Sequence, residues 1–317
     1  MRPVDRPSSA GEVVAVVVTY NGADWIQDCL QSLANSHHPV TTIVVDNGST
    51  DDSLTLVATF PDVICLPQKS NLGFGQANNI GIREALGRKA RWVFLLNQDA
   101  RVEPETVAKL VQASVTHPGF GILSPFHLDG EGAHLDARFA TFLSQAELGL
   151  LSDLYLGRKK EVYSTAFVNA AAWLVTSDCL DTVGGFDPLF FMYGEDNDYC
   201  HRATWHGFEI GLVPGAAVFH DRPADRFSEG VLGIPFESIV AWRFSVMLPR
   251  LTRPDGLFFW RIGSWGLQAL RTGFVLIGHG QLRDFLAWKL ALLRVIARLP
   301  TIWKHRSVNR AQGRHWL

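Results

Sequence analysis

The stretch Val93-Phe94-Leu95-Leu96-Asn97-Gln98-Asp99 decides the fold of this chain. Its four apolar residues form a run typical of a buried strand, and polar residues follow it at once. A carboxylate at the end of a buried strand needs solvent, a metal ion or a ligand beside it. In open α/β sheets, ligands bind at the carboxyl ends of the strands. The stretch therefore predicts a strand whose end opens into a binding cleft.

Two earlier apolar runs end in the same way. Residues 13–18 lead into Thr19-Tyr20-Asn21, and residues 43–45 lead into the loop Asp46-Asn47-Gly48-Ser49-Thr50-Asp51. That loop offers a carboxylate for the ring N–H of a pyrimidine base, and backbone amides for phosphate. A tight turn with Asp51 as an ordinary helix cap explains the same residues, so the loop by itself leaves both interpretations open.

Strand-like and helix-like segments alternate over the first 116 residues. The strands are expected at 13–19, 42–46, 62–66 and 91–96, and the helices at 24–35, 51–59, 74–87 and 104–116. This alternation predicts a mostly parallel sheet with helices on both faces. Asp51 is expected to cap the second helix, and Pro104 to occupy the first turn of the fourth.

The pattern becomes irregular between residues 125 and 166. Glycines and a short basic run predict an insertion made of loops and a hairpin. Regular structure is expected again as an apolar run at 167–175, a polar helix near 195–206, and strands near 208–213 and 216–220.

The composition is that of a globular protein with an uneven charge distribution. The chain has 317 residues, 47% of them hydrophobic, and a formal net charge of -2. Residues 240–317 hold 13 Lys and Arg against two acids, which gives +11, and the preceding part holds 16 against 29, which gives -13. A basic region of this kind meets an anionic membrane leaflet, a nucleic acid or the acidic body of the same protein.

Other features of the composition narrow the classes of protein. The four cysteines lie far apart without C-x-x-C spacing, which argues against a zinc knuckle or a disulfide framework and fits a reducing cytoplasm. Residues 1–11 are polar and Pro-rich, and are predicted to be a flexible leader and not a signal peptide. No apolar run approaches the roughly 18 residues that a membrane-spanning helix needs.

Residues 229–317 form a helical extension in which aromatic and aliphatic residues recur at helical spacing between basic ones. Six of the ten tryptophans lie there. A basic, Trp-rich amphipathic helix pair is typical of an interfacial membrane anchor. Packing on the preceding part of the chain or on a second subunit explains the pattern equally well. The arginines alternate with an apolar face, which argues against a nucleic-acid partner.

The acidic cluster Gly194-Glu195-Asp196-Asn197-Asp198 follows the aromatic run 190–193. Mutual repulsion among the acids, together with burial beside apolar residues, would raise the proton affinity of one carboxylate, which suits a general base. A helix N-terminus that favours acids explains one or two of them. It does not explain why they follow aromatic residues.

Two further motifs carry polar groups to the same region. Gly73-Phe74-Gly75-Gln76-Ala77-Asn78 is close to G-x-G-x-x-G, but Asn78 replaces the third glycine and the motif follows the third strand, which excludes a Rossmann dehydrogenase. Its glycines would let a helix start pass close to a ligand, with Asn71 and Asn79 as polar contacts. His220 ends an apolar strand and precedes Asp221, so it is either a metal ligand with a supporting carboxylate or a structural histidine.

In this order, these segments resemble the family 2 glycosyltransferases of the GT-A fold, most closely the non-processive bacterial rhamnosyltransferases. The resemblance covers roughly residues 12–222, and a GT-A domain is expected over 12–228. It rests on Val17–Asn21, Val45–Asp51, Asn71–Gly75, Asn97-Gln98-Asp99, Gly184–Asp187, and Glu195-Asp196 with Arg202. The glutamine of the Q-x-x-R-W element of processive members is missing here, so one sugar per encounter is expected.

The resemblance assigns roles to residues of this chain. It implies catalytic roles for Asp196, as the base, and Glu195, and a Mg²⁺ or Mn²⁺ ion at Asp99 and His220, with Asn97 in the place of the first acid of D-x-D. The implied donor-binding residues are Thr19, Tyr20, Asn21, Asp46, Asn71, Gly73, Asn79, Asn97, Asp99 and Arg202. Arg202, about two helical turns beyond the acids, would support either the acids or the donor diphosphate. The acceptor is expected near Asn169, Trp173 and Tyr193, with the 125–166 insertion beside it.

The function implied is inverting, metal-dependent transfer of one sugar, such as rhamnose, from a dTDP- or UDP-sugar to a lipid-linked or cell-surface glycan. The enzyme would then be cytoplasmic and peripheral on the inner face of the cell membrane, in polysaccharide biosynthesis. The alternative is a catalytically inactive nucleotide-sugar-binding or scaffold protein in which Asn97 marks a decayed metal site. The sequence does not fix the oligomeric state, and a homo-oligomer stays open.

Overall fold

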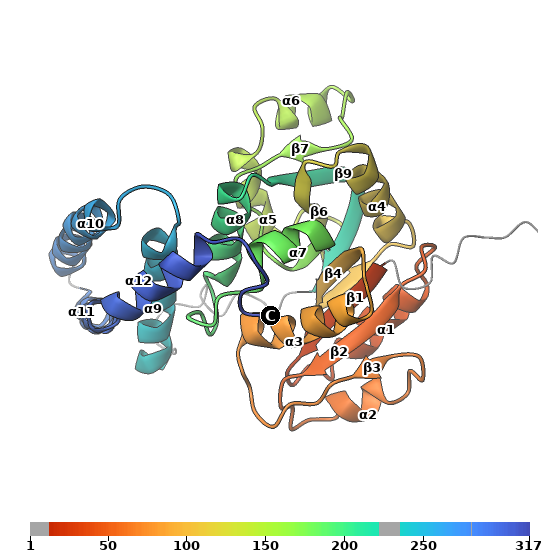
Figure 1. The fold of residues 1–317 in the computed structure, drawn as a ribbon, viewed down its shortest axis with the longest axis horizontal. Coiled ribbons are helices and arrows are strands. Elements are labelled where there is room, and N and C mark those ends of the chain that lie inside the picture. Colours follow the sequence, from red (N-terminus) through yellow and green to blue (C-terminus); the bar gives the residue numbers. More distant parts are fainter. Residues whose placement is uncertain (1–12, 222–234, 280) are drawn as a thin grey trace, which may run out of the picture.

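The computed structural model describes residues 13–221, 235–279 and 281–317, and its strands form a single sheet (Figure 1). The strands are β1 (Val13–Thr19), β2 (Thr41–Asp46), β3 (Ile64–Cys65), β4 (Trp92–Asn97), β5 (Ala100–Val102), β6 (Phe120–Asp129), β7 (Tyr163–Ser164), β8 (Ala172–Thr176) and β9 (Glu209–His220). Their order across the sheet is β3-β2-β1-β4-β8-β6-β9-β5, and β7 pairs with β9.

The N-terminal half of the sheet agrees with the sequence-based prediction. Its strands are parallel, and they alternate with the helices α1 (Ile26–Ala34), α2 (Ser53–Val57), α3 (Phe74–Gly87) and α4 (Thr106–Thr116). Asp52 occupies the N-cap position of α2 without a side-chain cap hydrogen bond, whereas Asp51 Oδ1 accepts from the Ser53 amide at 3.1 Å and so caps the helix as predicted. The predicted start of the fourth helix was wrong in detail, because Pro104 lies before α4, whose N-cap residue is Glu105.

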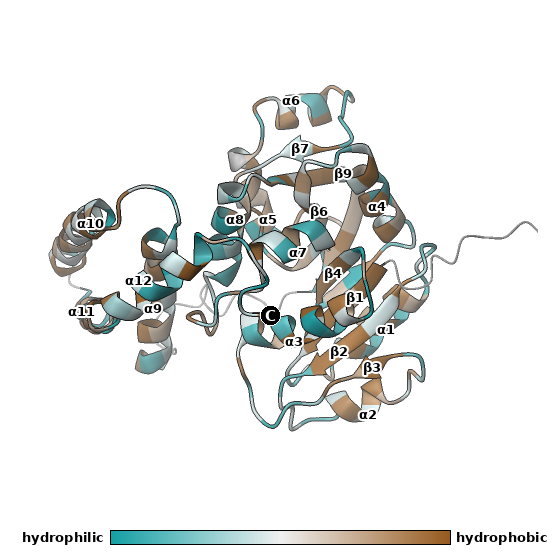
Figure 2. Ribbon diagram, viewed as in Figure 1, coloured by the Kyte–Doolittle hydropathy of each residue, from teal (hydrophilic) through white to brown (hydrophobic). Residues whose placement is uncertain are grey.

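Alternation along the strands explains the two-sided core. Val14 and Val16 face a core that contains Ala77 and Ile82 of α3, while Ala15 faces the opposite core. That second core includes buried residues of α1 and α4. Figure 2 shows the central strands in the brown of hydrophobic residues and the connecting loops mostly in teal. The sheet is therefore covered by helices on both faces, as predicted.

The second half of the sheet is mixed, which the sequence did not reveal. β8 runs antiparallel between β4 and β6, and β6 pairs in parallel with β9. The two strands predicted at 208–213 and 216–220 are one strand, since the register passes from Pro125–Val213 to Phe126–Ala217 across a bulge. Pro214 and Gly215 lie in this bulge, and they suggested a break.

The predicted insertion begins too early and is more helical than expected. Residues 125–129 belong to β6. The rest contains α5 (Ala137–Phe142), a short 3₁₀ helix (Leu143–Gln145) and α6 (Leu150–Tyr155) before β7. Instead of a regular hairpin, an isolated antiparallel bridge joins Leu128 to Leu135.

Two helices complete the sheet domain, α7 (Ser177–Val183) and α8 (Glu195–Trp205), and four make up the C-terminal region. These are α9 (Phe236–Thr252), α10 (Phe258–Gly278), α11 (Leu282–Ala297) and α12 (Leu299–Asn309), which lie to one side of the sheet (Figure 1). Their inner face packs on Phe190 of the sheet domain through Leu248 and Leu251. On the outer face, Phe259 is 79% and Phe274 is 74% exposed.

The expected packing on the catalytic body therefore accounts for one face of these helices, and the other face is open. No helix in the described ranges combines the length and the apolar character that a membrane crossing requires. The predicted leader at 1–11 and the predicted domain boundary at 228 and 229 lie outside the described residues.

Candidate active site

The ends of three parallel strands meet at one edge of the sheet. Thr19 pairs with Asp46 across β1 and β2, and Val18 pairs with Asn97 across β1 and β4. Gln98 fastens these ends together, because its Oε1 accepts hydrogen bonds from the Thr19 hydroxyl at 2.7 Å and from the Tyr20 amide at 2.8 Å. The polar groups that the sequence placed at strand ends are thus brought together.

The loop after β2 is held by its own side chains. Asp46 is buried, and its Oδ2 accepts from the amides of Gly48 and Ser49 at 3.3 and 3.2 Å. Its Oδ1 is buried without a hydrogen-bond partner in the described part of the chain. Asn47 ties this loop to the next, because its Nδ2 donates to Asn71 Oδ1 at 3.0 Å.

A cavity of about 460 Å³ opens at this edge. Nine of the predicted site residues line it: Tyr20, Asn71, Asn97, Asp99, Asn169, Tyr193, Glu195, Asp196 and His220. They come from strand ends, from the loops before α3, β8 and α8, and from α8 itself. One space therefore holds the predicted metal and catalytic residues together with part of the predicted donor and acceptor residues.

His220 lies between two carboxylates. Its Nε2 is 3.4 Å from Asp99 Oδ1, and its Nδ1 is 3.5 Å from Asp136 Oδ2. The pairing of β5 with β9 places Ala100 opposite His220, which brings the preceding Asp99 to the ring. Asp136, and not the predicted Asp221, is the carboxylate beside Nδ1. In the sequence Asp136 looks like no more than a helix cap, a role it also fills by accepting from the Phe139 amide.

Within the described ranges, no group of three or more His, Cys, Asp or Glu side chains is placed to hold a metal ion. Asp99 and His220 thus supply two neighbouring donor groups, and further ligands would have to come from outside these side chains.

The three acids at the start of α8 have different environments. Asp196 lines the cavity. Glu195 lines it too but is only 6% exposed, and burial, followed by the charge of Asp196, raises its pKa to about 8. Asp198 is fully buried, and its Oδ2 accepts from Arg202 Nε at 2.8 Å. The three acids thus differ in state. Asp196 is a carboxylate that lines the cavity, Glu195 is a mostly buried carboxyl that is protonated at neutral pH, and Asp198 is the anion of a buried ion pair.

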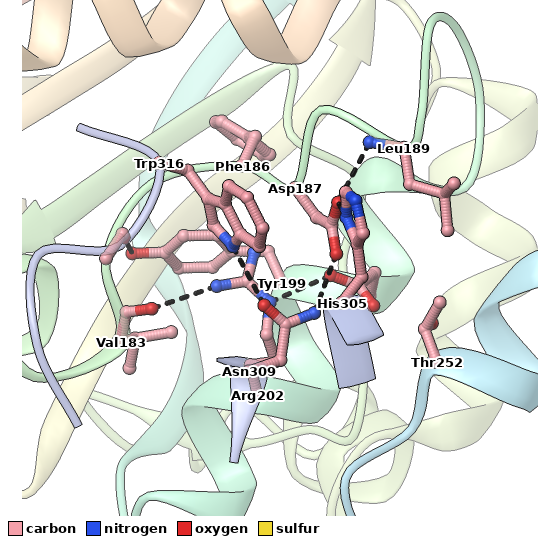
Figure 3. Close-up of polar contacts among 12 residues, drawn as sticks. Val183, Phe186, Asp187, Leu189, Tyr199, Arg202, Thr252, His305, Asn309 and Trp316 are labelled. Atoms are coloured by element: carbon pink, nitrogen blue, oxygen red, sulfur yellow. Dashed lines mark hydrogen bonds and ion pairs between the residues drawn. The ribbon is translucent and has the colours of Figure 1, made fainter. Parts of the chain in front are cut away.

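Arg202 supports the loop behind the cavity, as Figure 3 shows. Besides Asp198, its guanidinium donates to the carbonyls of Val183 and Gly185 at 3.0 and 2.9 Å. Of the two roles considered for Arg202, the geometry agrees with support of the acids and not with contact to a donor diphosphate, since Arg202 pairs with Asp198, is fully buried and lies outside the cavity.

The same loop is held from the other side by the C-terminal residues (Figure 3). Asp187 accepts from His305 Nδ1 at 2.6 Å and from Asn309 Nδ2 at 2.7 Å. Burial raises the pKa of Asp187, but the hydrogen bond and charge of His305, with smaller contributions from the Leu189 amide and the charge of Arg202, together outweigh it and leave that pKa below the usual range. The backbone amide of Gly185 also donates to the carbonyl of His315 at 2.8 Å. The chain end is thus attached directly to the loop that precedes the acidic cluster.

Two further predictions of direct ligand contact are wrong. The Asn79 side chain bonds the backbone of Phe186 twice. Its Nδ2 donates to the Phe186 carbonyl at 2.8 Å, and its Oδ1 accepts from the Phe186 amide at 2.7 Å. Trp173 is fully buried and stacks on the Phe186 ring, with centroids 6.2 Å apart. Both residues support the loop at 184–187 from within the core.

Four more predicted donor residues lie outside the cavity lining, and these are Thr19, Asn21, Asp46 and Gly73. The hydroxyl of Thr19 bonds Gln98, and the Asn21 Oδ1 accepts from the Thr50 amide at 2.9 Å. Gly73 has φ of +83°, and a Cβ there would lie 2.1 Å from the Phe191 carbonyl oxygen. A side chain is excluded at Gly73 because the loop at 190–193 passes so close.

Comparison with known proteins identifies the family. Residues 14–133 match the model of glycosyl transferase family 2. The chain is 30% identical over 233 residues to the N-acetylglucosaminyl-diphospho-decaprenol L-rhamnosyltransferase of Mycobacterium tuberculosis, an alignment that covers 65% of this chain and 75% of that protein. This chain belongs to glycosyl transferase family 2. The predicted family and enzyme class are thereby confirmed.

Two other similarities extend this result. The dTDP-rhamnosyl transferase RfbF of Shigella flexneri is 24% identical over 221 residues, which is 66% of this chain and 68% of that protein. The mannosyltransferase PcManGT of Pyrobaculum calidifontis, solved with GDP-Man and Mn²⁺, superposes with a TM-score of 0.57 at 16% identity, over 97% of this chain and 88% of that one. The second likeness confirms the GT-A fold. This glycosyltransferase transfers a sugar from a nucleotide sugar.

Proposed function

We propose that this glycosyltransferase moves one rhamnose from a dTDP- or UDP-linked donor to a hydroxyl of a lipid-linked or cell-surface glycan, with inversion at the anomeric carbon. The rhamnosyltransferase relatives support the choice of sugar. The observation that carries the proposal is the single cavity in which Asp196 faces the same space as Asp99 and His220. A proton acceptor and a site for a diphosphate are what one-step sugar transfer requires.

Asp196 is the general base of the proposed reaction. It takes the proton of the acceptor hydroxyl while that oxygen forms a bond to the anomeric carbon from the face opposite the nucleotide. The bond from that carbon to the diphosphate breaks, and the nucleoside diphosphate leaves with the electron pair. Glu195 is protonated at neutral pH because its pKa is raised to about 8. A neutral neighbour spares Asp196 the repulsion of a second charge.

The nucleotide is proposed to bind along the ends of β1, β2 and β4. Tyr20, Asn71 and Asn97 line that part of the cavity. Asp46 lies beneath it with an oxygen that lacks a hydrogen-bond partner among the described residues. A ring N–H of a pyrimidine base is a suitable donor for such an oxygen.

Asp99 and His220 would hold a Mg²⁺ or Mn²⁺ ion in this proposal. Their donor atoms fit, because a carboxylate and an imidazole nitrogen both ligate Mn²⁺, and Asp136 beside Nδ1 would orient the ring. When bound, the ion would offset the charge that develops on the leaving nucleoside diphosphate. The structure of PcManGT with GDP-Man and Mn²⁺ supports this part of the proposal by analogy.

The open face of the C-terminal helices is proposed to contact the anionic inner surface of the cell membrane. Leu257, Phe259 and Trp260 are each more than 70% exposed there, which is typical of an interfacial anchor. Sedimentation with anionic vesicles tests this step. The double variant Phe259→Glu with Trp260→Glu should stay in the supernatant while wild type pellets, and equal pelleting of both would refute it.

The reaction itself is tested with purified enzyme and a panel of dTDP-, UDP- and GDP-sugars, with and without Mn²⁺. A rhamnose donor should raise the melting temperature, since a ligand that binds the folded state stabilises it by mass action. The product of that donor should carry the opposite anomeric configuration by NMR. Retention of configuration, or transfer from no donor on the panel, would refute the proposal.

A further inference from the structure

A second cavity adjoins the active site on the side of the C-terminal helices. It measures about 670 Å³, and it is lined by residues of α8, α9, α10 and the α9–α10 connection, together with Phe142 and Phe167. Asp196 and Phe142 line both this cavity and the one that holds the donor residues. The proposed base therefore stands where the two spaces meet.

The second cavity carries an excess of positive charge. Arg250, Arg253 and Arg261 line it, whereas Asp196 is the one acid among its lining residues, and Asp255, which is not among them, pairs with two of the arginines. That carboxylate is shared, because Arg253 pairs with it at 2.9 Å and Arg261 at 2.7 Å. Arg250 is exposed and has no recorded ion pair within the described ranges, so its guanidinium is available to an anion.

His201 also lines this cavity, and its pKa is affected by the charge of the arginines. Burial, followed by the charge of Arg253, lowers the pKa of His201 to about 4. The imidazole is therefore neutral at pH 7. Its Nδ1 is buried without a hydrogen-bond partner in the described part of the chain. A neutral ring with an unused nitrogen adds a hydrogen-bonding group without adding to the repulsion between the arginines.

Apolar surface continues from this cavity along α10. Phe167 and Trp265 line the cavity beside the arginines. A third cavity shares Ser264 and Gln268 with it and extends past Leu267, which is 66% exposed. From Asp196 towards α10, the surface thus presents first a carboxylate, then the arginines, and then the exposed apolar face of the helix.

We propose that the second cavity is an acceptor subsite that binds a phosphate or diphosphate through Arg250 and Arg253, with the acceptor sugar at Asp196 and a polyprenyl chain along α10. Arginine suits this task because its planar fork bonds phosphate oxygens in pairs. The inference rests on the proposed function, and it narrows the acceptor to a sugar joined to a lipid through phosphate.

Binding of farnesyl diphosphate by isothermal titration tests the subsite without requiring transfer. Saturating dTDP is present throughout to occupy the donor site. Because Arg250→Gln loses one charge-assisted bond, the Kd for farnesyl diphosphate should rise about tenfold, and it should rise further in the double variant with Arg253→Gln. Lys289→Gln removes one charge from the exposed face of α11, outside the cavity, and should bind as wild type does.

Two more ligands separate the contribution of the diphosphate group from that of the apolar chain. Inorganic diphosphate should bind more weakly than farnesyl diphosphate but show the same loss in Arg250→Gln, and farnesol should be insensitive to that variant. The inference is overturned if wild type does not bind farnesyl diphosphate, or if Arg250→Gln and Lys289→Gln bind it equally well. Failure of the rhamnosyl transfer assay with intact, Arg250-dependent binding would instead refute the proposed function alone.

Discussion

The donor side and the acceptor side of the active site are built in different ways. On the donor side, strand ends are joined by short loops, and contacts such as Tyr20 to Gln98 connect neighbouring strands. On the acceptor side, Asp187 is bonded by His305 and Asn309, which lie more than 100 residues further along the chain. The donor side is therefore held by contacts between neighbouring strands of the sheet, whereas the loop that leads to Asp196 depends on the C-terminal helices.

The buried ion pair on the acceptor side should have the largest effect on stability. Arg202→Met leaves the Asp198 carboxylate fully buried without its partner, and we expect the free energy of unfolding to fall by about 3–5 kcal/mol. Arg88→Met is the matched control, because Arg88 and Glu84 form an exposed pair with the same i, i+4 spacing. Its cost should stay below about 0.5 kcal/mol. Urea unfolding measures both, and similar losses would contradict the proposed difference between the pairs.

The contact with α12 should have the next largest effect. His305→Ala removes the hydrogen bond to Asp187, and we expect a loss of about 1.5–3 kcal/mol near neutral pH. The pKa of Asp187 is lowered in the fold, so this stabilisation is present above the ordinary pKa of 3.8 and is lost as the pH falls below it.

One control variant bears on that prediction. His37→Ala breaks the exposed pair with Glu105 and should cost little. If His305→Ala were no more costly than His37→Ala, the chain end would not stabilise the 184–187 loop.

Glu195 gives a smaller effect with a distinct pH profile. Its folded pKa of about 8 lies above the ordinary 4.5, so wild type loses stability as the pH rises from about 4.5 to about 8. Glu195→Gln keeps the neutral shape and should remove that loss, with a gain of about 1–2 kcal/mol at pH 8 and none at pH 4. Thermal unfolding across this range measures it, with the exposed Glu131→Gln as control. A variant whose profile parallels that of wild type would refute the buried, protonated state.

The donor side offers the smallest expected change. Asn97 stands where the family pattern has an acid, so Asn97→Asp adds one negative charge beside Asp99. We expect Mn²⁺ to bind about three- to tenfold more tightly, or about 1 kcal/mol, by titration calorimetry. An unchanged Mn²⁺ affinity would argue against a metal at this strand end.

The same contrast explains what the sequence could predict. The first four strands and their helices follow from apolar runs and turns, and Asp46, Asn97 and Asp99 lie at strand ends as expected. The carboxylate of Asp136 beside His220 could not be predicted, because the contact depends on the fold bringing the N-terminus of α5 to the end of β9. For the same reason, Arg202 and Trp173 looked like ligand contacts although both are fully buried in the core.

Asp196→Asn tests the central claim most directly, because it removes the proposed base and keeps the shape of the side chain. The donor Kd, measured by titration calorimetry, should match that of wild type, while the single-turnover rate of transfer should fall by about 10²–10⁴. A transfer rate within a few-fold of wild type, with donor binding intact, would contradict the assignment of Asp196 as the base.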